Sequence, residues 1–264
     1  MFDLDALEAE LAHTIFAGKL HFAPITDSTN NDALAAARSG APHGSVWFAD
    51  EQLAGRGRGG NAWRSAAGDG LYVSTLLRLA IPTDRLLLLP LAAGLAAADA
   101  IRSASGLDID LRWPNDLLIG EKKTGGILVE ANSENGSAFA VVGIGINVHQ
   151  QGFEPGLATP ATSLDLEAGR TVNRQSLLAA LLKAVQYEAE SLRNPETAKA
   201  IPVRVEAASS WVRGRAVEVH GPQACTGITA GLDEHGFLLV NTADGQLTVQ
   251  TGGIRACIDS SEIH

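Results

Sequence analysis

Cysteine, basic N-terminal residues and long apolar runs are all scarce in this sequence. The two cysteines, at 225 and 257, match no metal-binding spacing and are too few for a disulfide framework. The N-terminal segment is acidic, whereas a secretory signal begins with positive charge. The longest apolar run, 86–98, contains Pro90 and is shorter than the roughly 18 residues of a membrane span. We therefore expect a soluble, cytoplasmic protein with reduced thiols and no membrane partner.

Positive charge is also in short supply. The 264 residues include 20 Lys and Arg against 30 Asp and Glu, which gives a formal net charge of −10. Because a phosphate backbone requires a basic surface, we expect no nucleic-acid partner. An anionic small ligand would need positive charge that is supplied locally.

Hydrophobic periodicity predicts two domains, 1–204 and 205–264. Helical and strand-like segments fill the first domain, and its helices are expected at 3–17, 31–38, 86–104 and 175–192. After residue 211 the chain has short alternating runs separated by Gly, Asp and Asn, which is typical of a small antiparallel barrel or sandwich. Strands of the large domain are expected at 20–26, 45–51, 71–79, 107–113, 117–120, 126–131 and 139–148.

The segment GRGRGG at 55–60 is the most distinctive in the chain. Its glycines fit the dinucleotide fingerprint G-x-G-x-x-G, but the sequence NAWRSAAGDG that follows cannot begin the helix that this fingerprint requires. Arg56 and Arg58 alternate with glycines, so their side chains can project from a backbone that approaches a ligand closely. Two such guanidinium groups suit bidentate contacts with carboxylate or phosphate oxygens. The alternative is a flexible, solvated loop.

Two further segments carry polar residues beside turns. The segment RWPND, 112–116, presents Asn115 and Asp116 at the end of a strand, either for a ligand or as an ordinary hairpin corner with a buried tryptophan. Lys123 precedes Thr124 and two glycines, where the backbone can pass close to a bound molecule. A lysine there is a point charge for an anion, or it only aids solubility.

Two more segments combine polar residues with an expected helix or strand. Ser28, Thr29 and Asn30 precede a helix, and helix capping alone would explain them. Asn147 ends the apolar strand GIGIN. A single buried amide usually caps a neighbouring turn, but it can also contact a ligand.

Taken in order, the motifs D-S-T-N, E-Q-x-A-G-R-G-R-G, W-P-N-D, K-x-x-G-I-L-V-E and G-I-G-I-N-V make the chain resemble the biotin protein ligases. The motifs extend over about residues 25–148. The resemblance implies an α+β fold, with a mixed-sheet catalytic domain of the biotin/lipoate ligase type and a small C-terminal SH3-like β-barrel. It also suggests a short form without the N-terminal DNA-binding domain of some relatives, since about 20 residues precede the first expected strand and a helix-turn-helix unit needs at least two helices.

The resemblance implies a ligase that joins biotin to ATP, with Mg²⁺ as the metal of its nucleotide, and releases pyrophosphate. The biotinyl-5′-AMP would then give its biotinyl group to one lysine of a biotin carboxyl carrier domain, as in acetyl-CoA carboxylase or a related biotin enzyme. No resident metal and no nucleophilic side chain are required. The enzyme would be a monomer or a homodimer.

Carried over position by position, the resemblance implies three sets of site residues. The expected biotin-binding set is Ser28, Thr29, Asn30, Gln52, Arg56, Gly57, Arg58, Lys123 and Gly126. The expected ATP and adenylate set is Arg58, Trp63, Arg112, Asn115 and Asn147. The expected catalytic residues are Arg58, Lys123 and Asp116, with Asp116 orienting or deprotonating the acceptor lysine.

The sequence departs from the family pattern at Gly59 and Arg112, where relatives often carry arginine and lysine, and at Gly125–Gly126, where they often have a glycine-alanine step. The segment 251–258 also matches poorly, so no site residue is assigned there. Three alternatives are a lipoate ligase or octanoyltransferase, a biotin-sensing regulatory protein, and a binding module without chemistry. We also expect the loop 52–64 to become ordered when ligand binds.

Overall fold

A seven-stranded mixed sheet forms the centre of the molecule in the computed structural model, which describes residues 2–134 and 137–257. The strand order is β1-β2-β3-β7-β6-β5-β4, with β1 parallel to β2 and the other neighbours antiparallel. The strands are β1 (Leu20–Thr26), β2 (Val46–Gln52), β3 (Gly70–Leu77), β4 (Asp110–Arg112), β5 (Asp116–Ile119), β6 (Lys122–Glu134) and β7 (Ser137–Asn147).

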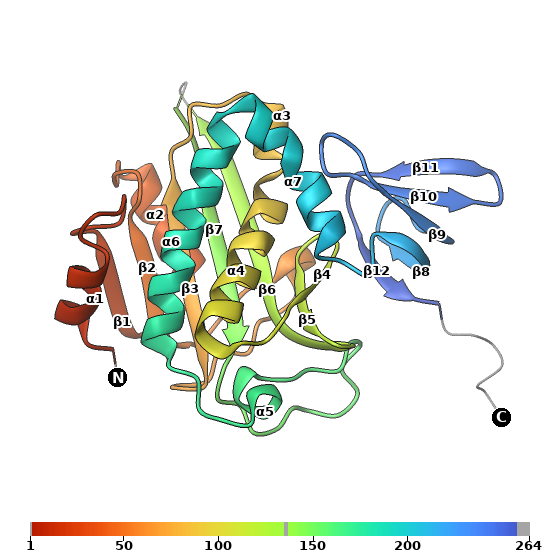
Figure 1. Ribbon diagram of the computed structural model, residues 1–264. Helices are drawn as coiled ribbons and strands as arrows, with labels where there is room; N and C mark the ends of the chain where they lie inside the picture. The colour runs from red at the N-terminus through yellow and green to blue at the C-terminus, as the bar shows by residue number, and fades with distance from the viewer. Residues whose placement is uncertain (1, 135–136, 258–264) are drawn as a thin grey trace.

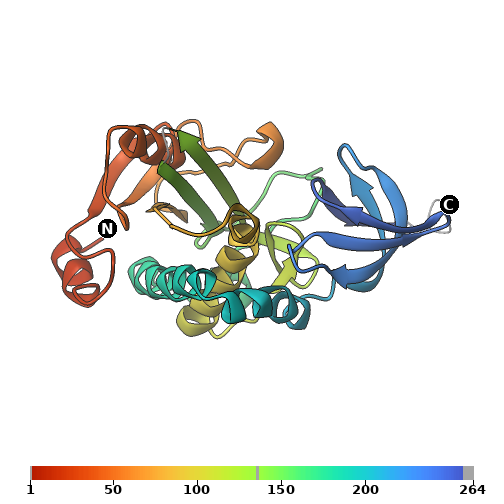
Figure 2. The same ribbon diagram turned by 90° about the horizontal axis from the view of Figure 1, so that it is seen from above.

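Helices cover both faces of this sheet, but unequally. The long helices α4 (Leu89–Ser105) and α6 (Arg174–Arg193) lie together on one face, as Figures 1 and 2 show. The other face carries α2 (Thr29–Arg38), whose Ala33 and Ala37 pack against Leu76, Phe139 and Val141. Because successive strand residues point to opposite faces, neighbouring residues of β7 alternate between the two cores. The remaining helices are α1 (Leu4–Glu10), α3 (Thr83–Leu86), α5 (Leu164–Ala168) and α7 (Pro195–Ala207).

The C-terminal part is a five-stranded antiparallel sheet in the order β11-β10-β9-β8-β12. It lies at the β4 end of the large sheet, away from α1 and the N-terminus (Figure 1). Trp113 donates from Nε1 to the carbonyl of Gly236 at 3.0 Å and so ties the two sheets together. The strands are β8 (Arg213–His220), β9 (Cys225–Leu232), β10 (Leu238–Thr242), β11 (Gly245–Val249) and β12 (Gly253–Ala256).

This architecture confirms the expected α+β class, a mixed sheet with a small all-β unit after it. The expected boundary after residue 204 falls inside α7, and the C-terminal strands begin at residue 213. Residues 258–264 of the expected second domain lie outside the described part of the chain. The division into two domains therefore stays a prediction.

Two expectations about helices were wrong. The helix expected over 3–17 ends at residue 10, because the backbone N–H of Ile15 donates to the side chain of Gln186 and the hydroxyl of Thr14 bonds to the carbonyl of Leu11. Helix α7 was not expected, since Pro202 lies inside it. The side chain of Asn194 caps α7 by accepting from the backbone N–H of Glu196 at 3.0 Å.

Candidate functional site

A cavity of about 1470 Å³ opens on the α2 face of the large sheet. Every residue predicted above to bind ligand or to act in catalysis lines this cavity. Its walls come from the N-terminus of α2, the loop after β2, the segment 112–116, strands β6 and β7, the segment 150–161 and the segment 251–255. The fold thus brings motifs that are far apart in the sequence together at one site.

Glycines in β6 and β7 form the floor of the cavity and leave room for two side chains above them. A Cβ atom on Gly143 would lie 2.0 Å from Oδ1 of Asn30. A Cβ atom on Gly145 would lie 2.6 Å from Nε1 of Trp63, and one on Gly126 would lie 3.4 Å from the same indole ring. The close approach of Asn30 and Trp63 therefore requires glycine at 143 and 145, whereas a Cβ atom at 126 would only touch the indole ring.

A chain of hydrogen bonds runs through buried polar side chains at the α2 end of the cavity. Gln52 Oε1 accepts from the backbone N–H of Thr29 at 2.9 Å, and the Thr29 hydroxyl lies 2.8 Å from that of Ser74. Ser74 donates to Oδ1 of Asn30 at 2.5 Å, and Asn30 Nδ2 donates to Glu130 at 2.9 Å. Because Ser74 donates its one proton to Asn30, the single proton of the Thr29 hydroxyl is shared between two acceptors, Ser74 Oγ and Gln52 Oε1, the latter at 3.1 Å.

The glycine-arginine loop is a short hairpin that continues from β2. Backbone hydrogen bonds join Gly57 to Asn61 at 2.7 Å and Trp63 to Gly55 at 2.8 Å. At its tip Gly59 has φ of 68°, a left-handed conformation that costs a side-chain-bearing residue about 1 kcal/mol. A Cβ atom there would meet open space, so the backbone conformation, not crowding, favours glycine.

Both arginines of this loop contact protein groups. Arg56 forms a bidentate ion pair with Glu130 of β6. Arg58 donates to the carbonyl of Gly252 and to Thr251 Oγ1, the latter at 2.9 Å, so the tip of the loop touches the C-terminal unit. Burial lowers the pKa of the Arg58 guanidinium, and the nearby charge of Asp116 opposes that shift.

A cluster of charges lies where the loop, β5 and β6 meet. Lys123 Nζ lies 2.5 Å from Asp116 Oδ1, and Arg112 Nη2 donates to Asp116 Oδ2 at 2.6 Å. Burial alone would raise the pKa of Asp116, but Lys123 and Arg112 outweigh it and hold that pKa below its usual value. Asp116 is therefore ionised at neutral pH and is a weak proton acceptor.

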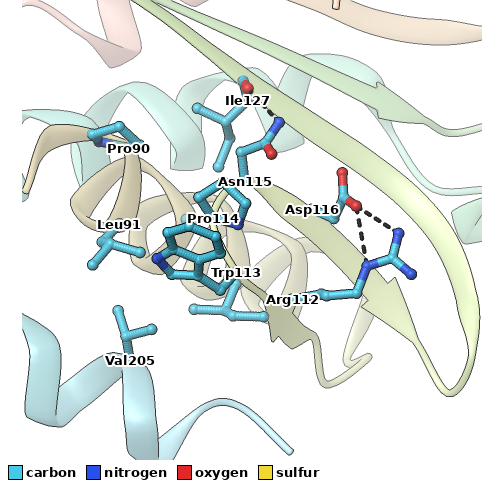
Figure 3. A pocket seen from close by; sticks show the side chains of 11 residues that line it. Pro90, Leu91, Arg112, Trp113, Pro114, Asn115, Asp116, Ile127 and Val205 are labelled. Carbon is cyan, nitrogen blue, oxygen red and sulfur yellow. Dashed lines mark hydrogen bonds and ion pairs between the residues drawn. The ribbon is translucent and has the colours of Figure 1, made fainter. Parts of the chain in front are cut away.

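The segment 112–116, which lines the cavity, is anchored against α4 and β6. Trp113 and Pro114, joined by a cis peptide bond, pack beside Leu91 of α4, and Asn115 points toward Ile127 (Figure 3). Asn115 donates from Nδ2 to the carbonyl of Ile127 at 2.9 Å and accepts from the backbone N–H of the same residue at 3.0 Å. These bonds fix the direction of the adjacent Asp116.

Two polar groups at the other side of the cavity have different surroundings. Asn147 is 7% exposed, and its Nδ2 donates to the carbonyl of Thr162 at 3.0 Å. It therefore holds a neighbouring segment, as a capping amide does. Trp63 lies over Lys123, with Nζ 5.5 Å from the ring centroid, and within the described residues its buried Nε1 has no hydrogen-bond partner.

Several residues around the cavity were not predicted from the sequence. Glu130, Gly143 and Gly145 belong to the motifs named above but had been given no site role, Ser74 lies in an ordinary strand sequence, and the segment 251–255 had been left without a site residue. Only the glycine pair at 252–253 gives a weak local signal. Across residues 2–134 and 137–257, no group of three or more His, Cys, Asp or Glu side chains is arranged to hold a metal ion. Within the same residues no helix has the length and hydrophobicity to cross a bilayer.

The comparison with known proteins agrees with this geometry. Residues 22–147 match the model of the biotin/lipoate A/B protein ligase family. A biotin--[acetyl-CoA-carboxylase] ligase from Mycobacterium tuberculosis is 34% identical over 235 residues, which cover 87% of this chain and 85% of that protein. The chain therefore belongs to the biotin/lipoate A/B protein ligase family. Another member, the bifunctional ligase/repressor BirA of Bacillus spizizenii, is 34% identical over 86% of this chain and 70% of its own length.

A solved structure of the same family extends the likeness beyond the matched segment. Biotin protein ligase from Aquifex aeolicus, in complex with biotin and ATP, has a TM-score of 0.77 and 30% sequence identity to the chain. The similarity covers 90% of this chain and 98% of that one. It therefore includes the C-terminal unit as well as the large sheet.

Proposed function

We propose that this family member is an ATP-dependent biotin-protein ligase. It joins the carboxylate of biotin to the α-phosphate of ATP, and then passes the biotinyl group to a lysine of a biotin carboxyl carrier domain. The observation that carries the proposal is the cluster of Arg58, Arg112 and Lys123 around Asp116, at the wall of a cavity of about 1470 Å³. The names of the relatives favour this activity over a lipoate ligase or a binding module.

The α2 end of the cavity suits the ring system of biotin. A ureido ring has two N–H donors and one carbonyl acceptor, and Ser28, Thr29, Asn30 and Gln52 offer hydroxyl and amide groups of both kinds there. All four are buried or half-buried, and hydrogen bonds through Ser74 join Thr29, Asn30 and Gln52, so these three are already oriented before a ligand arrives. The backbone at Gly57 and Gly126 also lines the cavity, and Gly126 lies beside Lys123 and the ring of Trp63.

The opposite end suits the nucleotide. Trp63 provides a ring on which adenine can stack, while its buried Nε1 lies against Gly145 of β7. Arg112 supplies positive charge, while Asn115 and Asn147 stabilise the backbone around the site. Mg²⁺ arrives with ATP and neutralises part of the phosphate charge.

The first reaction step requires positioning and charge stabilisation. An oxygen of the biotin carboxylate attacks the α-phosphorus of ATP, the bond to the β-phosphate breaks, and pyrophosphate leaves. Two anions must approach each other, and Arg58 and Lys123 lower the cost of that approach. No side chain of the protein becomes covalently modified.

In the second step the amine of the acceptor lysine attacks the carbonyl carbon of the mixed anhydride. AMP leaves as the amide bond forms, and the amine loses a proton to solvent or to a phosphate oxygen. The lowered pKa of Asp116 makes it a poor base, so we assign it the task of orienting Lys123, Arg112 and the incoming amine. Of the two roles expected for Asp116 from the sequence, orienting and deprotonating the acceptor lysine, we therefore keep only the first.

Biotin-dependent release of pyrophosphate from ATP, followed by a mass gain on an added carrier domain, tests the proposal. Release with lipoate but not with biotin would contradict it. Lys123→Gln should lower kcat/KM by about 100-fold, because the reacting carboxylate loses a charge-assisted contact. Lys122→Gln is the matched control. Its side chain is 55% exposed and pairs with Glu167, so its activity should stay within about twofold of the wild type.

A further inference from the structure

Glu130 lies just beyond the lining of the cavity and makes contacts that no expectation from the sequence included. Arg56 donates from Nη1 to Glu130 Oε1 at 3.1 Å and from Nη2 to Oε2 of the same carboxylate. The two side chains are 37% and 28% exposed. The pair joins the first arm of the glycine-arginine hairpin to strand β6.

The carboxylate of Glu130 is held from a second direction. Asn30 donates to its Oε2 at 2.9 Å, and the Oδ1 of Asn30 accepts from Ser74, which is fully buried. Three donor groups from the loop and from α2 thus converge on one carboxylate. A side chain fixed in this way presents a rigid acceptor to Arg56, so little entropy is lost when the ion pair closes.

The second arginine of the loop has different surroundings. Arg58 donates to the carbonyl of Gly252 and to Thr251 Oγ1, and it lines the cavity together with Arg112, Asp116 and Lys123. Arg56, which also lines the cavity, gives one N–H from each terminal nitrogen to the carboxylate of Glu130. An anionic ligand that took Arg56 would leave the Glu130 carboxylate without its cation, which is costly for a partly buried charge.

We infer that Glu130 is a positioning residue that fastens the loop over the cavity through Arg56. Exchange of ligand then requires this ion pair to open. Loss of Glu130 lets the loop open more often, so the adenylate escapes faster while the transfer step keeps its rate. The faster escape of the adenylate rests on the proposed function, whereas the fastening of the loop by Glu130 does not.

Hydrogen exchange of residues 53–65 in the ligand-free protein tests the fastening directly. Glu130→Gln removes the charge and keeps the size of the side chain, and we expect exchange in this loop to become about five- to tenfold faster. Glu154→Gln is the matched control, because Glu154 pairs with Arg64 of the same loop but both side chains are more than 70% exposed. It should leave exchange in 53–65 unchanged. An unaltered thermal midpoint in both variants would show that the opening is local.

A charge swap separates fastening from ligand contact. Glu130→Arg alone should speed loop exchange, and adding Arg56→Glu should return it toward the wild-type rate. The doubly substituted protein should also regain slow release of biotinyl-5′-AMP, measured by trapping the released intermediate. Exchange in the double variant as fast as in Glu130→Arg would overturn the inference. If the wild type forms no adenylate at all, the proposed function fails, but the exchange measurements still decide whether Glu130 fastens the loop.

Discussion

The substitution Gly143→Ala tests how closely Asn30 lies against the floor of the cavity. A Cβ atom at this position would lie 2.0 Å from Oδ1, 2.8 Å from Cγ and 3.1 Å from Nδ2 of Asn30. The strand cannot retreat, because residue 143 is registered with Ser74 of β3 on one side and Leu128 of β6 on the other. Asn30 must therefore rotate away.

The cost of that rotation follows from the bonds that Asn30 makes. It loses the hydrogen bond from Ser74 and the bond to the Glu130 carboxylate, and its amide is only 3% exposed. One neutral and one charge-assisted hydrogen bond contribute about 2–4 kcal/mol together. The free energy of unfolding should fall by that amount, and biotin-dependent activity should fall with it.

Urea unfolding of four proteins measures this effect: wild type, Gly143→Ala, Asn30→Ala and the double variant. In the Asn30→Ala background the clash is gone, and alanine is favoured over glycine in a strand by about 0.5–1 kcal/mol. Gly143→Ala should therefore be neutral or slightly stabilising there. Gly152→Ala, with no atom within 4 Å of its Cβ, is the control and should change the stability little. An equal loss in both backgrounds would refute the contact between Gly143 and Asn30 as the cause.

Three further predictions concern other parts of the molecule. The pKa of Asp116 is lowered from 3.8 in the folded state, so its stabilising contribution is present above that value and is lost as pH falls through the folded pKa; the stability difference between wild type and Asp116→Asn should be smaller at pH 2 than at pH 7, and a constant difference would contradict the ion pairs. Arg204→Ala should lower the free energy of unfolding by about 3 kcal/mol, because it leaves the carboxylate of Glu188, 2% exposed, without its cation; a thermal midpoint within 1 °C of wild type would show that the pair contributes nothing. Trp63→Ala should raise the KM for ATP about tenfold through lost stacking, with the KM for biotin little changed, and the reverse pattern would move Trp63 to the biotin end.

Local sequence was enough to predict the side chains that lie at turns and strand ends. The segments that contain Arg58, Asp116 and Lys123 carry glycine, proline or asparagine beside the charged residue, so their chemistry is visible in a short window. The main sheet was also predictable, because its strands are apolar runs bounded by turn residues. Their common place on one cavity wall followed only from the resemblance to a known family.

The contacts that these side chains make with distant parts of the chain could not be predicted in the same way. Ser74 lies in an ordinary strand sequence, and Glu130, although it ends the motif K-x-x-G-I-L-V-E, meets Arg56 across 74 positions of the chain. The geometry of the hairpin turn decides which of the two alternating arginines meets Glu130 and which meets the segment 251–252, and no pattern of residue types encodes that choice. The missed helix α7 has a similar cause, since a single internal proline outweighed the capping signal at Asn194 in the sequence pattern.

The contact between Arg58 and Thr251 spans 193 positions of the chain. During synthesis the hairpin is therefore made long before the residues that its tip touches, and a nascent chain of 200 residues has a glycine-arginine loop with one end unattached. The cavity acquires its last wall only when β12 has paired with β8. Ligand binding therefore stabilises only the complete chain. A molecule truncated before β12 should bind its substrates weakly even where its large sheet has folded.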